Sequence, residues 1–324
     1  MKILAIVNGG DDEGSTKYRL MMYRDFLAEN GVEIETVRKR DIDESTVKRA
    51  SEVDLVFNQK CLFKKSLALK IMKAAKRSCF DIDDAVWTRP DKPYGLITGK
   101  RVKNRLHCWF KHADFVMASN GFLADYARTQ GANVKLMPMS LRLDEWFPIE
   151  KIEDDVIRIG WAGSPGNIPY LESLDKVFKR LKEDYQDKIE ICVYSGRKPQ
   201  LSVPFEWQDY APGTESGFVQ KLDIGLLPLK DDEYLKGKSP IKTIQYLSCA
   251  VPVVAYVSGG TREILSEERA FSVQTEDEWV LSIKKLIDDF ELRQKMGKNG
   301  RDFVLETHAY ERCKYKLLNL LKGD

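Results

Sequence analysis

Short apolar runs alternate with helix-like segments along most of the chain. In the first half, the runs that read as buried strands are Ile3–Val7, Val32–Val37, Val53–Phe57, Ser78–Ile82, Phe115–Ala118 and Val134–Met137. Helix-like segments lie between several of them, at residues 16–30, 62–77, 100–112 and 120–130. Apolar strands separated by helices are typical of a parallel sheet that is covered on both faces. The pattern therefore predicts an α/β fold.

The rhythm breaks once, in a segment with two prolines and an acidic cluster, and then restarts. The second half has strand-like runs at 156–161, 189–194, 205–207, 224–229 and 251–257, and helical patterns at 167–185, 214–221, 240–249, 276–289, 291–306 and 309–322. We predict an N-terminal domain (1–140), a linker (141–155), a C-terminal domain (156–305) and a final helical segment (306–324). Two Rossmann-like, doubly wound domains would face a central cleft, with ligands at the carboxyl ends of the strands.

The composition is typical of a globular protein, and the charge is unevenly distributed along the chain. Of the 324 residues, 43% are apolar and 31% are charged, and no apolar run is long enough for a transmembrane helix or a signal peptide. The six cysteines are spaced singly, without a zinc pattern, as expected of reduced thiols in a cytoplasmic protein. The net charge is +2, but residues 60–111 hold 14 basic and 4 acidic residues. This excess is either a solvated face or a surface for an anionic partner, such as a phosphorylated acceptor, a nucleic acid or an acidic membrane.

Three strand-to-helix turns in the second half are suited to phosphate. In GKSPIKTIQY (237–246), Ser239 is a good N-cap and Pro240 suits the first helical position. Lys238 and Lys242 disfavour a helix N-terminus unless an anion binds there. The turns GWAGSPGN (160–167) and VSGGT (257–261) repeat the arrangement, with Thr261 as a cap. Plain turns with solvated lysines remain the alternative; together the three indicate a phosphorylated ligand. The P-loop and GxGxxG patterns are absent, which argues against a Walker-type NTPase or a typical dinucleotide enzyme.

The segment GKSPIKTIQYLSCAVPVVAYVSGGTREIL resembles the donor-binding segment of retaining GT-B glycosyltransferases of family 4, also called group 1. Supporting similarity lies in STKYRLMMYRDFLAENGVEIE, CFDIDDAVW, HADFVMASNGFLADYARTQGANVKLMPM and IGWAGSPGN, so the resemblance covers nearly the whole chain. It implies an acceptor-binding N-terminal domain, a C-terminal domain for the nucleotide sugar, and a last helix that packs back on the N-terminal domain. No catalytic metal and no cofactor is implied, because the nucleotide-diphosphate sugar is a co-substrate.

The resemblance also assigns roles to residues. Lys238 would neutralise the donor diphosphate and stabilise the leaving group as a catalytic residue, because a fixed ammonium opposes the negative charge that develops there. The implied donor-binding residues are Gly163, Ser164, Asn167, Lys238, Ser239, Lys242, Gln245, Gly259, Gly260 and Thr261. The implied acceptor-binding residues are Gly9, Gly10, Ser15, Thr16 and Arg19.

Three positions depart from the family pattern. Gly237 and Gln245 stand where the family has paired glutamates, and a carboxamide offers one acceptor oxygen to the ribose hydroxyls. Ser164 follows Gly163 where the family has an arginine. The N-domain histidine is replaced within Asp81–Asp84, and we assign its catalytic place to Asp83; a metal-binding DxD and a helix cap are the other interpretations.

Two basic segments suggest the acceptor side. Residues 62–77 are amphipathic with lysines off the apolar stripe, and 99–112 adds Trp109 and Phe110 to a basic run. Each is either a helix on the core with a solvated basic face or a contact with an anionic membrane surface. Nucleic acid is disfavoured, because no recognised module accompanies the charge.

The leading hypothesis is a cytoplasmic, peripheral membrane glycosyltransferase of glycan or polysaccharide biosynthesis. It would transfer a sugar with retention, without a metal, from a nucleotide-diphosphate sugar to a glycan or lipid-linked acceptor. The alternative is a non-catalytic nucleotide-sugar-binding or scaffold protein of the same fold. Gln245→Glu is expected to raise donor affinity.

Overall fold

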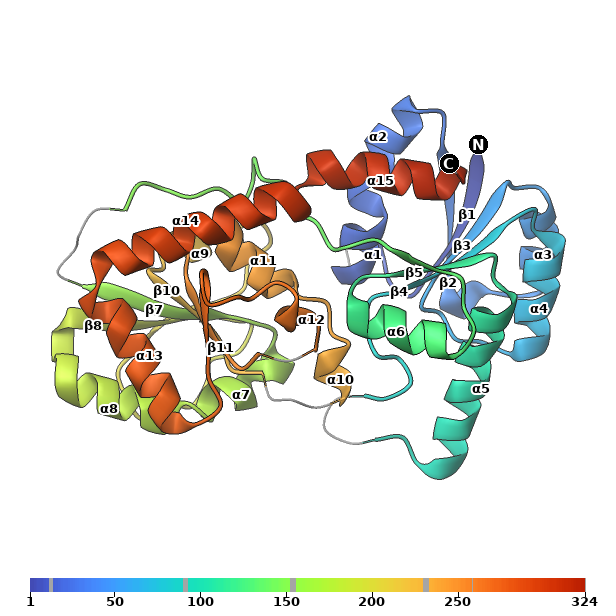
Figure 1. Ribbon diagram of the computed structural model, residues 1–324. Helices are drawn as coiled ribbons and strands as arrows, with labels where there is room; N and C mark the ends of the chain where they lie inside the picture. Colours follow the sequence, from blue (N-terminus) through green and yellow to red (C-terminus); the bar gives the residue numbers. More distant parts are fainter. Residues whose placement is uncertain (12–13, 90–92, 152–155, 230–232, 258, 324) are drawn as a thin grey trace. The chain divides into compact units, whose positions relative to one another are not determined.

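The chain forms two compact units, each built on one parallel sheet (Figure 1). The structure is a computed structural model that describes residues 1–11, 14–89, 93–151, 156–229, 233–257 and 259–323. Unit 1 contains Met1–Met139, Asp232–Ser239 and Glu311–Asp324; unit 2 contains Ser140–Asp231 and Pro240–Tyr310. The predicted α/β class with two Rossmann-like domains is thereby confirmed.

The sheet of unit 1 has the strand order β2-β1-β3-β4-β5-β6. Its strands are β1 (Lys2–Val7), β2 (Glu33–Arg38), β3 (Leu55–Gln59), β4 (Ser78–Ile82), β5 (Phe115–Ala118) and β6 (Val134–Leu136). Every residue of β3, β4 and β5 is buried, whereas β2 and β6 at the edges are partly exposed. Central strands covered on both faces need continuous apolar runs, which is why the sequence pattern located them.

Helices cover both faces of this sheet. They are α1 (Gly14–Arg19), α2 (Arg24–Glu29), α3 (Glu44–Ser51), α4 (Lys65–Ala74), α5 (Leu96–His112), α6 (Gly121–Thr129), α10 (Glu233–Lys236) and α15 (Tyr310–Lys322), with 3-10 turns η1 (Met21–Tyr23) and η2 (Lys39–Asp41). The predicted helix 16–30 is broken, because Leu20 leaves the helical region at φ −143° and ψ −53°. Helix α3 was not predicted, although Asp43 and Thr46 form a capping box at its start.

The sheet of unit 2 has the order β12-β11-β10-β7-β8-β9. Its strands are β7 (Ile157–Ala162), β8 (Ile189–Tyr194), β9 (Glu206–Gln208), β10 (Ile224–Leu227), β11 (Val253–Ala255) and β12 (Ala270–Ser272). Its helices are α7 (Ile168–Glu172), α8 (Asp175–Tyr185), α9 (Glu215–Gln220), α11 (Ile241–Ser248), α12 (Gly259–Arg262), α13 (Glu276–Asp288) and α14 (Phe290–Thr307), with 3-10 turns η3 (Pro165–Asn167) and η4 (Gln186–Lys188).

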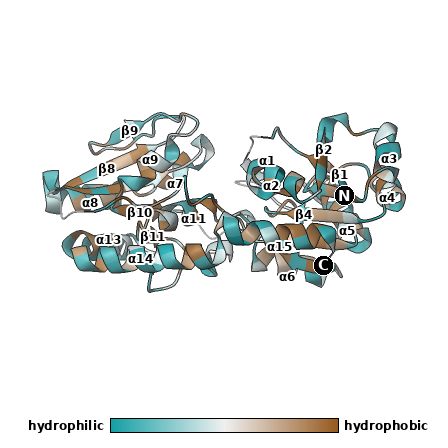
Figure 2. Ribbon diagram, turned by 90° about the horizontal axis from the view of Figure 1, so that it is seen from above, coloured by the Kyte–Doolittle hydropathy of each residue, from teal (hydrophilic) through white to brown (hydrophobic). Residues whose placement is uncertain are grey.

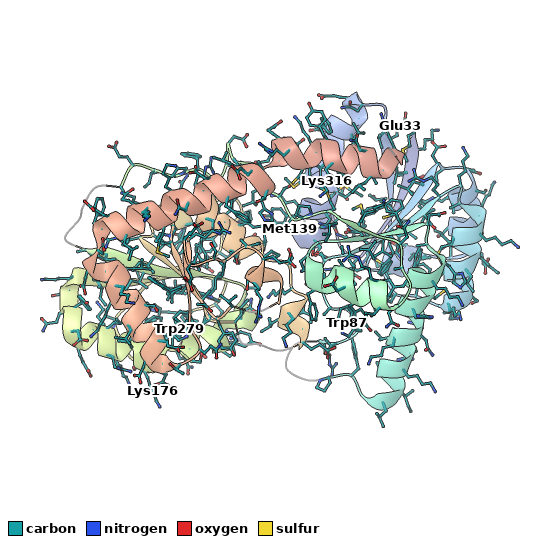
Figure 3. The ribbon with its side chains drawn as sticks, viewed as in Figure 1. Glu33, Trp87, Met139, Lys176, Trp279 and Lys316 are labelled. Carbon is teal, nitrogen blue, oxygen red and sulfur yellow. The ribbon has the colours of Figure 1, made fainter. Side chains whose placement is uncertain are left out.

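Hydrophobic residues make up most of the strands, and the helices alternate between hydrophobic and hydrophilic residues (Figure 2). In unit 2, Trp279 of α13 is 5% exposed and joins the core formed with α8 and β7. Lys176, on the outer face of α8, extends away from that core (Figure 3). The amphipathic pattern of these helices thus fixes which side meets the sheet.

Two segments are placed differently from a simple division of the chain into halves. The described part of the predicted linker is packed into unit 2: Leu141 bridges to Ala309, and Arg301 donates to the Trp146 carbonyl at 2.7 Å. Residues 152–155 of that linker lie outside the described residues. Residues 232–239 return to unit 1, as does Glu311–Asp324, where Tyr315 contacts Phe26 edge-to-face. No described helix has the length and apolar character needed to cross a bilayer.

Candidate functional site

In each unit, the strand order reverses at one point, and the predicted loops lie there. In unit 1 the chain builds β2 on one side of β1 and β3 on the other, so the loops after β1 and β3 diverge. In unit 2 the corresponding pair is β7 and β10. Ligands of open α/β sheets bind outside the carboxyl ends of the strands at such points. Gly9 and Gly10 follow β1, and Gly163, Ser164 and Asn167 follow β7, so these residues occupy the expected edges.

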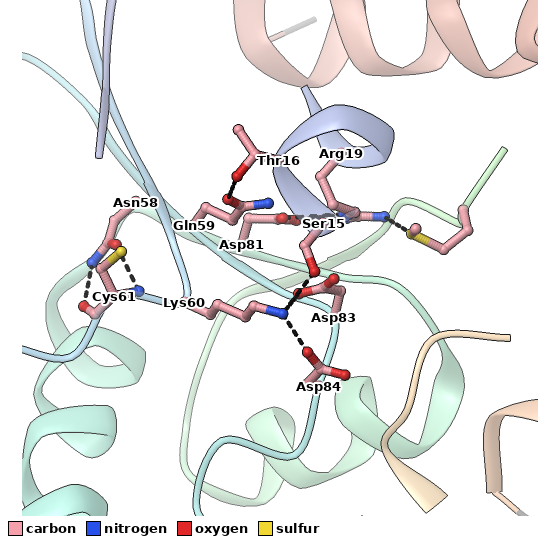
Figure 4. A network of polar contacts seen from close by, with 11 residues as sticks. Ser15, Thr16, Arg19, Asn58, Gln59, Lys60, Cys61, Asp81, Asp83 and Asp84 are labelled. Carbon is pink, nitrogen blue, oxygen red and sulfur yellow. Dashed lines mark hydrogen bonds and ion pairs between the residues drawn. The ribbon is translucent and has the colours of Figure 1, made fainter. Parts of the chain in front are cut away.

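At the edge of unit 1, Lys60 is the centre of a charged network (Figure 4). Its Nζ lies 2.7 Å from Ser15 Oγ and 2.8 Å from Asp83 Oδ1, and it also pairs with Asp84. Burial opposes the charge, but the two carboxylates outweigh it and raise the pKa of Lys60. Lys60 adopts a left-handed backbone (φ 43°), which is uncommon for a non-glycine residue. Four groups are therefore held together at the ends of β3 and β4.

Beneath this network lies a second, fully buried one. Arg19 Nη2 lies 2.5 Å from Asp81 Oδ1, and both side chains are at most 1% exposed. Arg19 Nη1 also donates to the Met137 carbonyl at 2.5 Å. Thr16 donates to Gln59 at 2.8 Å. Thr16 and Arg19, predicted to bind the acceptor, are thus interior groups that hold α1 against β3 and β4, while Ser15 lies one layer outward.

The aspartates of the DIDD run have separate partners. Asp81 is held by Arg19, whereas Asp83 and Asp84 face Lys60. Asp83, the predicted replacement of a catalytic histidine, is 1% exposed, and Asp84 is the more accessible, with 21% of its side chain exposed. Burial and the neighbouring Asp83 raise the pKa of Asp84 to about 6. Asp84 is the carboxylate of this edge that reaches solvent, and sequence reasoning did not single it out.

Lys238 also belongs to unit 1, because α10 docks there. Trp87 Nε1 donates to Glu233 at 2.8 Å, and Lys238 is close enough to Asp84 to lower its pKa. A Cβ on Gly237 would come within 2.6 Å of Ala85 Cβ and 2.9 Å of Ala85 N. Position 237 therefore has no space for the glutamate of the family pattern. The close packing of Gly237 on Ala85 therefore explains why glycine stands where the family has the first of its paired glutamates.

In unit 2, Gln245 has a partner that the sequence did not reveal. Glu215, at the start of α9, pairs with Lys242 and accepts from Gln245 Nε2 at 3.1 Å. Gln245 is 1% exposed, and its Oε1 has no hydrogen-bond partner among the described residues. A carboxylate therefore does lie beside position 245, supplied from α9. From the sequence, Glu215 could have been suspected only because it stands at the start of a predicted helix in the second domain.

Two predicted helix caps of the donor-binding turns are wrong in detail. Helix α11 begins at Ile241 with Pro240 at the N-cap (φ −82°, ψ 32°) and no side-chain cap, so Ser239 lies one residue further out. Thr261 lies within the four-residue α12 rather than ahead of a helix. Gly259 adopts φ 40°, and Gly260 follows within α12; Ser258 lies outside the described residues.

Gly163 has a packing role as well. A Cβ there would lie 2.2 Å from the Trp161 ring, so the turn after β7 needs glycine whatever binds beside it. Below the turn, Tyr246 OH accepts from the Ala162 amide at 2.8 Å, which ties α11 to the end of β7. This hydrogen bond fixes the position of α11 relative to the turn after β7.

Comparison with known proteins agrees with this geometry. Residues 181–319 match a family model described as glycosyl transferase-like. No curated protein matches by sequence. Among solved structures, sucrose-phosphate synthase from Thermosynechococcus elongatus is similar at a TM-score of 0.76 and 14% identity, over 99% of this chain and 98% of the other.

Two further structures are similar over the full length. HepE of Anabaena, solved with UDP and glucose, has a TM-score of 0.73 and 12% identity, with 100% of both chains covered. An α-glucosyltransferase solved with UDP and DNA has a TM-score of 0.64 and 11% identity, with 99% of both chains covered. The chain has the GT-B architecture. Its residues 181–319 are similar to the glycosyl transferase-like family, and the solved structures agree with the fold that the resemblance implies.

Proposed function

We propose that the protein transfers a sugar, with retention of configuration, from a nucleotide-diphosphate sugar to a glycan or lipid-linked acceptor. The observation that carries the proposal is the cluster at the start of α11 in unit 2: Lys242, Gln245 and Glu215 beside the turn after β7. One carboxylate and one free amide oxygen are suited to ribose hydroxyls, and the lysine to phosphate. HepE, which is similar over its whole length, has been solved with UDP-glucose, which supports a nucleotide-sugar partner.

Lys238 is the proposed catalytic residue on the donor side. As the donor bond breaks, negative charge grows on the departing diphosphate, and an ammonium fixed nearby lowers the barrier. This charge is supplied by the protein itself, so we propose that transfer needs neither a catalytic metal nor a resident cofactor. Ser239, Gly259, Gly260 and Thr261 remain proposed donor contacts, and Asp83 a proposed catalytic residue of unit 1.

Donor turnover across a panel of nucleotide sugars tests this function. Lys238→Ala should lower kcat by about 100-fold or more, because it removes a charge used mainly in the transition state. Lys236→Ala, two residues earlier in the same segment, should stay within about threefold. Full activity of the Lys238 variant would remove that residue from the mechanism. Anomeric configuration of the product, read by NMR, and activity in a chelator test retention and metal independence.

Membrane contact is part of the same proposal. Helix α4 and helix α5, which correspond to the basic segments 62–77 and 99–112, belong to unit 1, and α5 begins with two apolar residues in solvent. Leu96 is 95% exposed and Ile97 is 85% exposed. Apolar side chains next to lysine and arginine are suited to an anionic bilayer surface. We propose a peripheral protein at the cytoplasmic membrane face.

A non-catalytic nucleotide-sugar-binding protein is the second candidate, favoured by Gly237 and Gln245 at the paired-glutamate positions. Thermal stabilisation by a nucleotide sugar, without hydrolysis or transfer over a broad acceptor panel, would support it. Measurable turnover of any donor would exclude it.

A further inference from the structure

The carboxyl edge of the unit 1 sheet holds a pocket of about 400 Å³ that the predicted acceptor residues do not explain. Its charged lining consists of Lys39, Lys60, Asp84, Arg89, Arg101 and Arg105. Lys39 follows β2, Lys60 follows β3, Asp84 and Arg89 follow β4, and the remaining two belong to α5. Three strands of one sheet and one helix thus direct their charges to one place.

The charge of this pocket is strongly unbalanced. Lys60 is offset by Asp83 and Asp84, so it adds no free positive charge. Lys39, Arg101 and Arg105 form no ion pair with any residue that the structure describes. Arg105 is half-buried, and the apolar residues Leu62 and Val102 also line the pocket. Cations gathered without a counter-ion repel one another, and a bound anion relieves that repulsion.

The same chemistry continues on both sides. One adjoining pocket shares Asn8 and Lys39 and adds Gly9, Gly10, Arg38 and Arg40. Another shares Arg101 and Arg105 and adds Lys64, Lys65 and Lys100. The middle pocket differs from both because it contains Asp84, together with the rings of Tyr94 and Tyr234. A carboxylate and two aromatic rings are suited to a sugar or other polyol, and the arginines to an anion attached to it.

We propose that the acceptor carries a phosphate group, and that Lys39, Arg101 and Arg105 bind this phosphate. The hydroxyl-bearing part of the acceptor then faces Asp84. Guanidinium groups bind phosphate oxygens in pairs of charge-assisted hydrogen bonds, which gives the site its preference for phosphate over neutral sugars. This inference rests on the proposed transferase function, because it names the class of acceptor for the same edge of unit 1. A phosphomonoester of a soluble sugar and the phosphate of a lipid-linked acceptor share this chemistry.

Binding of n-octyl phosphate to the full chain, measured by titration calorimetry without donor, is the primary test. Wild type should bind it, and Arg101→Gln/Arg105→Gln should weaken binding at least 10-fold. Lys103→Gln is the matched control, since Lys103 is exposed on the same helix but lines none of these pockets. n-Octyl glucoside, which is uncharged, should bind at least 10-fold more weakly than the phosphate. Equal losses in the double variant and in Lys103→Gln would overturn the proposal.

Two further measurements test whether the arginines bind phosphate at a defined site or any negatively charged surface or polymer. If the double variant loses binding to phosphatidic acid vesicles but keeps its affinity for free octyl phosphate, the arginines bind a surface charge, and the proposal fails. Equal competition by a single-stranded oligonucleotide would indicate general polyanion binding and would also overturn it. Nucleotide-sugar binding by thermal shift must survive in the double variant. Wild-type protein that turns over a nucleotide sugar but does not bind octyl phosphate would refute the acceptor class, whereas wild-type protein that binds octyl phosphate but turns over no donor would refute the proposed function.

Discussion

At the scale of single residues, the ion pair Arg19–Asp81 is costly to break because both side chains are buried. Asp81→Ala would leave the Arg19 guanidinium at 1% exposure with its main partner removed. Breaking a buried ion pair from one side costs about 3–5 kcal/mol, so we expect that loss in the free energy of unfolding by urea. Asp11→Ala is the control, because Asp11 pairs with Arg24 at the surface and should cost about 0–1 kcal/mol. Similar losses in the two variants would contradict this account.

Asp84 makes the free energy of unfolding depend on pH. The sign of this dependence follows from its pKa, which is raised to about 6 from an ordinary value of 3.8. A raised pKa means that this group contributes stability below pH 4 and loses it as the pH rises through 6. The full shift corresponds to about 3 kcal/mol. The side chain is 21% exposed, so water screens part of it and we expect about 2 kcal/mol. Asp84→Asn should therefore gain about 2 kcal/mol relative to wild type between pH 4 and pH 7 in unfolding titrations. A pH-independent difference would show that Asp84 is ionised normally.

The pair Gln245–Glu215 changes an expectation drawn from sequence alone. The family pattern predicts that Gln245→Glu raises donor affinity, but the new carboxylate would lie about 3 Å from Glu215, with Lys242 as the shared cation. We now expect the single variant to lose about 1–3 kcal/mol of stability and to bind the donor no better, as for like charges in a buried site. Adding Glu215→Gln restores one donor and one carboxylate and should recover most of the loss. A double-mutant cycle in urea measures this coupling, and additive effects would refute it.

At the scale of elements, close packing of α14 on the end of α11 depends on glycine. A Cβ on Gly297 would lie 2.1 Å from the carbonyl oxygen of Ala250, a backbone atom that cannot move aside alone. Gly297→Ala should therefore cost about 2 kcal/mol or more of unfolding free energy. Gly217→Ala on α9, where no atom lies within 4 Å of the added Cβ, should stabilise by up to about 1 kcal/mol. If both substitutions change the free energy of unfolding alike, the effect of Gly297→Ala comes from helix propensity and not from the contact with Ala250.

Buried elements were the ones that the sequence could locate. The runs Ser78–Ile82, Phe115–Ala118 and Ile189–Tyr194 agree with β4, β5 and β8 at both ends, because a strand covered on two faces is apolar over most of its length. The three-residue β12 and the four-residue helices α10 and α12 have too few residues to show a period. The candidate site divides in the same way. Lys242 and Gln245 follow from one local motif, whereas Glu215, Lys60 and Arg105 acquire meaning only from partners 23 or more residues away in the chain, or from a pocket shared by several loops.

At the scale of the whole molecule, positive charge and exposed apolar residues coincide on one unit. Residues 60–111 hold 14 basic and 4 acidic residues, and α5 within them begins at Leu96 and Ile97 (Figure 1). Basic residues near an anionic bilayer contribute about 1 kcal/mol each, and a large apolar side chain that enters the interface adds about 1–2 kcal/mol. Neither contribution alone gives firm binding, so the proposed membrane contact requires both.

Cosedimentation with vesicles separates the two contributions. Wild type should bind vesicles of anionic lipid and not those of zwitterionic lipid, with binding that falls as salt rises. Leu96→Ser/Ile97→Ser should weaken binding at least 10-fold at every salt concentration, because it removes only the apolar part. Leu281→Ser in unit 2, at a side chain 60% exposed, should change nothing. If the double variant binds as wild type does, the membrane is held by charge alone, and α5 does not enter the interface.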